Sequence, residues 1–183
     1  MPRINPVTDA SAPDKSRPML QNLRKALGGV PNILATLANS PAALQAYLGF
    51  GQALSGSKLS NAAREQIAVA IAGENSCGYC ASAHTALGGK AGLAADELAR
   101  NLRGESADPR TQAALDFARA VVIKRGHIAD ADLAAARQAG YGDDEIIDII
   151  AVVAINIFTN YFNHIAGTEI DFPHVHVPEP ATI

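Results

Sequence analysis

Large aromatic side chains are scarce in this sequence of 183 residues, which has no tryptophan, four tyrosines and five phenylalanines. The apolar fraction is nevertheless 48%, so alanine, leucine and isoleucine must supply most of the core. A core of this composition favours closely packed helices over a sheet. The length suits one domain with its own hydrophobic core.

A strong charge of either sign is also absent. The formal net charge of -3 gives no reason to expect a nucleic acid or an anionic membrane as a partner. No apolar run follows the first residues, so we expect no signal peptide and a cytoplasmic protein. The apolar stretch 146–162 is interrupted by an aspartate and two asparagines. Since a membrane span needs roughly 20 consecutive apolar residues, this stretch predicts a buried helix instead.

No segment alternates apolar and polar residues between hairpin turns, as strands do. Helix signals recur instead, with Ser or Asp before a helix, Pro at its first position and Gly after its end. They predict an all-α protein with an extended N-terminal arm (1–17), a helical domain (18–167) and an extended C-terminal tail (168–183). The expected helices are 18–27, 32–38, 41–54, 61–72, 77–88, 94–102, 109–124, 130–139 and 144–166.

Cysteine is confined to Cys77 and Cys80. Without an export signal, such a pair indicates a catalytic or metal-binding role rather than a structural disulfide. His84 follows one helical turn later, so both thiols and the imidazole share one helix face. A continuous helix would leave Glu65 about 18 Å from Cys77. The break at 73–76 predicts a helical hairpin that brings Glu65 level with His84.

This combination is suited to thiol redox chemistry. A free thiol has a pKa of about 8.5, and a helix N-terminus or an imidazolium lowers that pKa. A thiolate attacks a hydroperoxide and becomes a sulfenic acid, with which a second thiol condenses to a disulfide. Glu65 and His84 are expected to move the protons, as base and acid. An outside dithiol must then reduce the disulfide again.

The run Glu65-(11 residues)-Cys77-Gly78-Tyr79-Cys80-(3 residues)-His84 resembles the AhpD-like alkylhydroperoxidases of the carboxymuconolactone decarboxylase superfamily. Further segments look like its peroxidase-related branch, and the similarity covers most of residues 18–173; these segments are Val30-Pro31-Asn32, Asn156, Asn160, Asn163-His164 and Asp171-Phe172-Pro173. The resemblance implies an all-α bundle with an internally repeated helix pair, assembled as homotrimers or hexamers.

The resemblance also implies an oxidoreductase that reduces peroxides through its dithiol, with no metal, haem or other cofactor. Some members are re-reduced by a protein-bound dihydrolipoamide, so a lipoyl protein is an expected partner. Position by position, Glu65, Cys77, Cys80 and His84 match the family's catalytic set. Tyr79 stands where the best-known members have a second histidine. Because a phenol is a far weaker base near pH 7, we expect Tyr79 to be an accessory group only.

Two arguments disagree about which cysteine attacks the peroxide. The helix dipole favours Cys77, which is nearer the N-terminus of its helix. The family assigns the peroxidatic role to the second cysteine, here Cys80, and the resolving role to Cys77. The spacing of Cys80 and His84, one turn apart, agrees with the family, and we favour Cys80.

Other interpretations of the same residues remain. Cys77, Cys80, His84 and Glu65 are a possible set of zinc ligands. The chain is alternatively a decarboxylase or lactone enzyme of the same superfamily, or a thiol sensor or oligomerisation module without turnover. In the tail, His174 and His176 are separated by one residue, so in an extended segment both imidazoles point the same way and can bind a metal ion. With no third ligand in view, we expect this tail to pack over a neighbouring subunit.

A second pair repeats the spacing of the first, because Glu145 and His164 are 19 residues apart, as are Glu65 and His84. Each glutamate opens a very apolar segment, which is typical of a duplicated helix pair. The second copy has no cysteines. We therefore expect Glu145 and His164 to be structural or interfacial.

Overall fold

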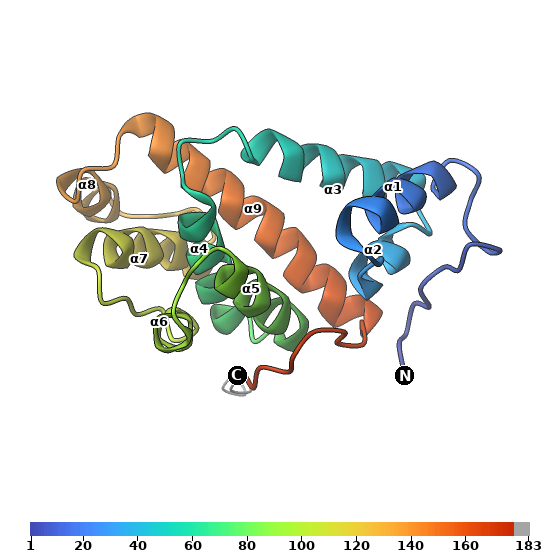
Figure 1. The fold of residues 1–183 in the computed structure, drawn as a ribbon. Helices are drawn as coiled ribbons and strands as arrows, with labels where there is room; N and C mark the ends of the chain where they lie inside the picture. Colours follow the sequence, from blue (N-terminus) through green and yellow to red (C-terminus); the bar gives the residue numbers. More distant parts are fainter. Residues whose placement is uncertain (178–183) are drawn as a thin grey trace.

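The computed structural model describes residues 1–177; the end of the predicted tail, 178–183, lies outside the described residues. Residues 1–177 form nine α-helices and no strand (Figure 1), so the prediction of an all-α protein is confirmed. The helices are α1 (Arg17–Leu27), α2 (Asn32–Leu37), α3 (Pro41–Leu54), α4 (Asn61–Glu74), α5 (Gly78–Lys90), α6 (Ala95–Asn101), α7 (Pro109–Ile123), α8 (Asp130–Gln138) and α9 (Asp143–Ala166).

Most helix ends fall within one or two residues of the expected positions. Side chains of Ser40, Ser60 and Asp108 accept hydrogen bonds from the third backbone N–H of their helices, as N-caps do. The C-terminal end of α5 also lies close to its expected position, since the helix includes Gly88 and Gly89 and ends at Lys90. A Cβ at Gly88 would lie 2.6 Å from the Leu98 side chain, so this glycine lets α6 approach α5.

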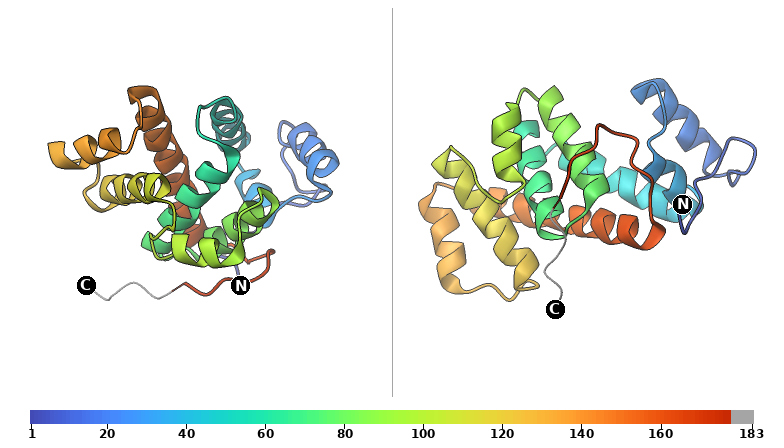
Figure 2. Two further views of the ribbon diagram at one scale, coloured as in Figure 1. Left: turned by 60° about the vertical axis from the view of Figure 1, so that its left-hand side comes forward. Right: turned by 90° about the horizontal axis from the view of Figure 1, so that it is seen from below.

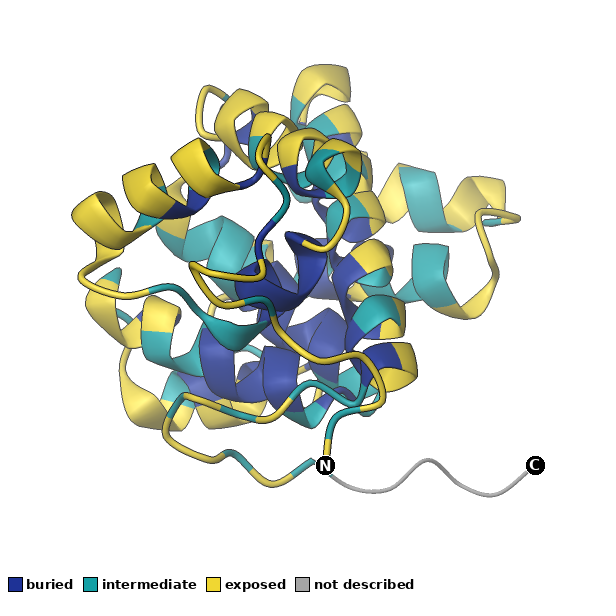
Figure 3. Cartoon of the chain, turned by 90° about the vertical axis from the view of Figure 1, so that its right-hand side faces the viewer, coloured by how far each residue is buried: buried dark blue, intermediate teal, exposed yellow. Residues whose placement is uncertain are grey.

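The long helix α9 runs through the middle of the bundle, and α3, α4, α5 and α7 lie around it (Figure 1). Helix α4 packs against α5, α7 and α9, and its residues from Gln66 to Ala72 are all buried. One core cluster joins α4, α7 and α9, and a second surrounds α2 and the start of α5. Both cysteines belong to the second cluster. The buried residues gather in the interior between the helices (Figure 3).

Helix α9 serves two environments. Among the described residues it is the one helix long and apolar enough, by length and composition alone, to cross a membrane. Its inner face supplies core side chains such as Ile149 and Val153, so the expected buried helix is confirmed for this face. Its outer face is exposed and also apolar, with Ile147, Ile150, Phe158, Tyr161 and Ile165.

The two terminal segments have no helix but are packed on the bundle. In the N-terminal segment, the Arg3 N–H donates to the Ala166 carbonyl over 2.7 Å, and the buried Ser16 hydroxyl donates to the Ala38 carbonyl. At the other end, residues 168–177 cross α5 (Figure 2), where the Val175 N–H donates to Ser82 Oγ over 2.9 Å. The tail therefore packs on a helix of its own chain.

The expected hairpin between α4 and α5 is present. Ser76, between the two helices, has a φ of 53°, in the left-handed region that reverses the chain after a helix. The Cys77 N–H donates to the Ala72 carbonyl over 2.8 Å, which closes the end of α4. Cys77 is then the N-cap of α5.

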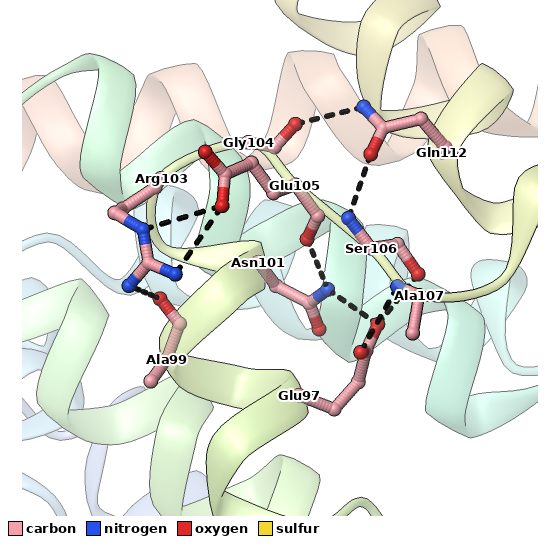
Figure 4. Close-up of polar contacts among 9 residues, drawn as sticks. All are labelled: Glu97, Ala99, Asn101, Arg103, Gly104, Glu105, Ser106, Ala107 and Gln112. Atoms are coloured by element: carbon pink, nitrogen blue, oxygen red, sulfur yellow. Dashed lines mark hydrogen bonds and ion pairs between the residues drawn. The ribbon is translucent and has the colours of Figure 1, made fainter.

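Gly73, near the end of α4, touches the connection between α6 and α7. The connection is held by a polar network in which Glu97 accepts from Asn101 Nδ2 and the Ala107 N–H (Figure 4). Gln112 accepts from the Ser106 N–H and donates to the Gly104 carbonyl, so its amide closes the network. A Cβ at Gly73 would overlap the carbonyl oxygen of Leu102.

We expect Gly73→Ala to destabilise the fold by about 1–3 kcal/mol, because the new methyl group displaces backbone that the network holds. Gly89→Ala is the control: it lies in a helix and its Cβ meets nothing within 4 Å. This control is expected to gain about 0.5–1 kcal/mol. Urea unfolding followed by circular dichroism measures both changes. Equal effects would show that the contact with Leu102 carries no energy.

Candidate active site

The hairpin brings Glu65 on α4 and His84 on α5 into contact. Nδ1 of His84 lies 2.8 Å from Oε2 of Glu65. The His84 side chain is 22% exposed and the Glu65 side chain is 14% exposed. An ionised carboxylate only accepts, so Nδ1–H is the donor. This bond fixes the tautomer of the ring and leaves Nε2 for other chemistry. The predicted meeting of these two residues is therefore confirmed.

The two cysteines differ in what they face. Both are free thiols and almost fully buried, and Sγ of Cys77 accepts from the Cys80 N–H over 3.4 Å. Cys80 lines a cavity of about 430 Å³ in which His84 also lies, whereas Cys77 is absent from the lining. A molecule in the cavity therefore reaches Cys80 first.

Helix α9 adds amide groups to this site. Nδ2 of Asn163 donates to Sγ of Cys80 over 3.2 Å, and Asn160, one turn away, accepts from Asn75. A hydrogen bond to sulfur stabilises the thiolate more than the thiol. Asn163 is thus a candidate site residue that the chemistry of the CxxC motif does not indicate. Its signals in the sequence are the recurrence of asparagines on an otherwise apolar helix and the resemblance of Asn163-His164 to the peroxidase-related branch, and neither of them indicates a contact with Cys80.

The electrostatics separate the two thiols. The neighbouring Cys77 thiol lowers the pKa of Cys80 to about 6, against burial, with help from His84, Asn163 and Asn160. The hydrogen bond with Cys80, together with burial, raises the pKa of Cys77. Burial disfavours an imidazolium, but Glu65 and Cys80 outweigh it and raise the pKa of His84. Near neutral pH the site therefore favours a Cys80 thiolate and a Cys77 thiol, beside an imidazole whose pKa is shifted toward the protonated form.

The cavity in front of Cys80 is largely apolar. The lining comes from α1, the α1–α2 connection, α2, α3, α5, α9 and the C-terminal segment; the side chains include Val30, Pro31, Ile33, Leu34, Tyr47, Ala83, Leu87, Thr159 and Phe172. Its volume exceeds what hydrogen peroxide needs. An organic molecule with an apolar body fits this lining better than a small polar one.

Tyr79 lies between the cysteines and holds two distant segments together. Its hydroxyl donates to Oδ1 of Asp171 over 2.8 Å and accepts from the Ile33 N–H over 3.2 Å. The other oxygen of Asp171 accepts from the Asn32 N–H, and the Phe172 ring packs edge-on against Tyr79. Burial raises the pKa of Tyr79. With its hydroxyl engaged on both sides, Tyr79 acts on the walls of the cavity rather than on protons.

The second glutamate and histidine do not form a comparable site. Both lie on α9, about 28 Å apart at 1.5 Å per residue, whereas Glu65 and His84 lie on two helices. Glu145 pairs with Arg110 over 2.7 Å, and Nε2 of His164 bonds to the Asn75 carbonyl over 2.9 Å. Each residue has a structural contact, as expected for this pair.

No group of three or more His, Cys, Asp or Glu side chains within residues 1–177 is arranged to hold a metal ion. The four residues of the zinc interpretation do not converge, because Glu65 is bonded to His84 and Cys77 lies behind Cys80. His174 and His176 are both exposed. The geometry therefore gives no support to a metal-binding function.

Comparisons with known proteins agree with this geometry. Residues 41–123 match the model of the carboxymuconolactone decarboxylase family. A peroxidase-related protein with an alkylhydroperoxidase AhpD core, from Ralstonia eutropha JMP134, is 31% identical; the match covers 93% of this chain and 92% of that one, with a TM-score of 0.82. A peroxidase-related protein from Silicibacter sp. TM1040 is 27% identical over 91% and 92%, with a TM-score of 0.80.

A third solved structure has the same fold and a different activity. It is the debrominase Bmp8, in complex with 2,3,4-tribromopyrrole, at 20% identity over 92% of this chain and 91% of that one, with a TM-score of 0.78. At this identity the likeness concerns the fold alone. Comparison with curated proteins returned no match.

Proposed function

Because this chain belongs to the AhpD/carboxymuconolactone decarboxylase superfamily, we propose that it is a dithiol peroxidase that reduces organic hydroperoxides. The observation that carries the proposal is the asymmetry of the two thiols. Cys80 faces the cavity with a lowered pKa, and Cys77 lies behind it as a protonated thiol. A peroxidase of this type needs one thiolate that attacks the peroxide and one thiol that then condenses with the sulfenic acid.

In the first step, the Cys80 thiolate attacks the terminal oxygen of R–O–OH. The O–O bond breaks, Cys80 becomes a sulfenic acid, and the alkoxide leaves. The protonated imidazole of His84, held by Glu65, supplies the proton that converts the alkoxide to the alcohol. The cysteine is oxidised and the peroxide is reduced, so the electrons balance.

In the second step, the Cys77 sulfur attacks the sulfenic acid of Cys80 and expels water. The Cys77 proton and the hydroxyl of the sulfenic acid leave together, and a disulfide forms. The cysteines are two residues apart at the start of α5, a spacing that closes a disulfide with little movement of the backbone. An external dithiol, of which dihydrolipoamide on a lipoyl protein is the candidate, then returns both cysteines to thiols by exchange.

Two further features of the expected protein remain predictions. The dithiol cycle suits a reducing compartment such as the cytoplasm. A homo-oligomer, a trimer or hexamer, is in keeping with the exposed apolar outer face of α9, since large exposed apolar patches mark interaction surfaces. Light scattering of the purified chain measures this assembly.

The proposal is tested by the stoichiometry of peroxide consumption. Without a reductant, we expect the reduced protein to consume one cumene hydroperoxide per chain and to lose both thiols. With dihydrolipoamide, consumption should continue and remain proportional to the dithiol added. A single equivalent in both experiments indicates a thiol sensor. No loss of thiols at all would refute the peroxidase and leave a superfamily enzyme of another kind.

A further inference from the structure

Tyr47 enters the cavity from α3 and has no role in the steps above. Its side chain lines the cavity together with Cys80, His84 and Asn163, and its ring packs against Phe158 with centroids 6.5 Å apart. Burial raises the pKa of Tyr47 to about 12, and the charges of Cys80 and Glu65 act in the same direction. The phenol therefore lies within electrostatic reach of the reacting sulfur, and it stays protonated at neutral pH.

The hydroxyl of Tyr47 is a hydrogen-bond donor without an acceptor among the described residues. The hydroxyls of Tyr79 and Tyr141 donate to Asp171 and to the Arg110 carbonyl, but within residues 1–177 the Tyr47 hydroxyl bonds to nothing. Asn163 has an unused acceptor, because its Oδ1 is buried without a hydrogen-bond partner. A buried polar atom without a partner is uncommon, so the Asn163 oxygen beside the cavity points to a ligand, and the partly buried Tyr47 hydroxyl on the cavity wall is a donor available to the same ligand.

A hydroperoxide has a chemical group that complements each of these two unpaired groups, and both residues line the same cavity as Cys80. Its O–H is a donor for Oδ1 of Asn163, and the oxygen attached to carbon is an acceptor for the phenol of Tyr47. We propose that Tyr47 is a further catalytic residue, which donates a hydrogen bond to the leaving oxygen of an organic hydroperoxide while Cys80 attacks the other oxygen. This inference rests on the proposed peroxidase function.

The charge that Tyr47 meets appears only as the O–O bond breaks. The leaving oxygen then becomes an alkoxide, and a donor already in place stabilises it more than it stabilises the bound peroxide. The hydrogen bond moves no proton permanently. His84 still delivers the proton that forms the alcohol, and Tyr47 ends the step neutral.

The size of the effect must depend on the leaving group. Cumene hydroperoxide leaves as a strongly basic alkoxide, whereas perbenzoic acid, a molecule of similar size, leaves as benzoate, which is a weak base. Only the alkoxide needs a strong donor in the transition state. Removal of the phenol hydroxyl should therefore slow the reaction with cumene hydroperoxide selectively.

The experiment is single-turnover oxidation of the reduced protein by each peroxide, in wild type, Tyr47→Phe and Tyr161→Phe. Tyr161 is 55% exposed on the outer face of α9, so its variant is the matched control. We expect Tyr47→Phe to react about 10²-fold more slowly with cumene hydroperoxide, with less than about a threefold change for perbenzoic acid. Tyr47→His, which retains an N–H donor, should recover part of the lost rate.

The other outcomes are distinguishable. An equal loss with both peroxides assigns Tyr47 to packing, and no loss with either removes it from the reaction; each result overturns the inference and leaves the peroxidase intact. If the wild type oxidises with neither peroxide, the proposed function fails and the inference fails with it. The rate of alkylation of Cys80 by iodoacetamide, measured on each variant, reports whether the thiolate itself has changed.

Discussion

Replacement of Cys80 by serine is expected to reduce peroxide consumption by at least about 10³-fold, as removal of a nucleophile does in other enzymes. The reason is that Cys80 alone faces the cavity and carries the lowered pKa. Cys77→Ser should behave differently. It retains the attacking thiolate, so it reacts once with peroxide and then stops, because no thiol remains to form the disulfide.

The two variants are separated by trapping the sulfenic acid with dimedone and by mass spectrometry of the adduct. We expect the adduct on Cys80 in Cys77→Ser and almost none on Cys77 in Cys80→Ser. Ser82→Ala is not a suitable control, since Ser82 holds the C-terminal segment; Thr85→Ser, on the same helix and outside the lining of the cavity, leaves both thiols unchanged. An adduct found only on Cys77 would reverse the assignment of the two roles.

Removal of the imidazole is expected to have the second largest effect. In His84→Ala, the charge that helps to lower the pKa of Cys80 is lost, so this pKa rises from about 6 and less thiolate is present at pH 7. The proton donor for the alkoxide is lost as well. We expect the peroxidase rate at pH 7 to fall by about 10²-fold. Glu65→Gln should act in the same direction and more weakly, because Glu65 raises the pKa of His84.

The sign of the pH dependence follows from these shifts. The Cys80 thiolate is present above its pKa, so iodoacetamide alkylation of the wild type should increase as the pH rises through about 6. In His84→Ala the midpoint should move to higher pH. Glu145→Gln is the matched control, because Glu145 pairs with Arg110 at the start of α9, away from the thiols. A midpoint that stays near 6 in His84→Ala would contradict the electrostatic role of His84.

The helices were predictable because their ends carry local signals. Ser40, Ser60 and Asp108 satisfy backbone donors within their own first turns, so sequence neighbours alone determine those ends. The extension of α5 from Gly88 to Lys90 had no such signal. What the structure adds at this position is a tertiary contact, because the Leu98 side chain of α6 approaches Gly88 where a Cβ would stand. The hairpin that joins Glu65 to His84 was predictable, since both lie a similar distance from one chain reversal.

The contacts of the other site residues could not be predicted from sequence patterns, even where, as for Asn163, the family resemblance included the residue. Asn163 and Tyr47 lie 83 and 33 residues from Cys80 in the chain, and the packing of α9 and α3 alone brings them to it. Tyr79 presents the opposite case. Its identity as a phenol was plain, but its bond to Asp171 decides what the hydroxyl does. Spacing along a helix predicts which side chains share a face. It does not predict which of these side chains are hydrogen-bonded to a residue from another segment.

The hydrogen bond between Tyr79 and Asp171 means that the first turn of α5, which carries Cys80, also holds the C-terminal segment in place. The turn that carries Cys80 also holds residues 168–177 through Tyr79, while Ser82 binds Val175. Asp171 and Phe172 in turn form part of the cavity wall. Detachment of residues 168–177 would therefore remove part of the cavity wall in front of the Cys80 sulfur. Tyr79, one of the two residues between the cysteines, therefore links the burial of the thiolate to the docking of residues 168–177 on α5.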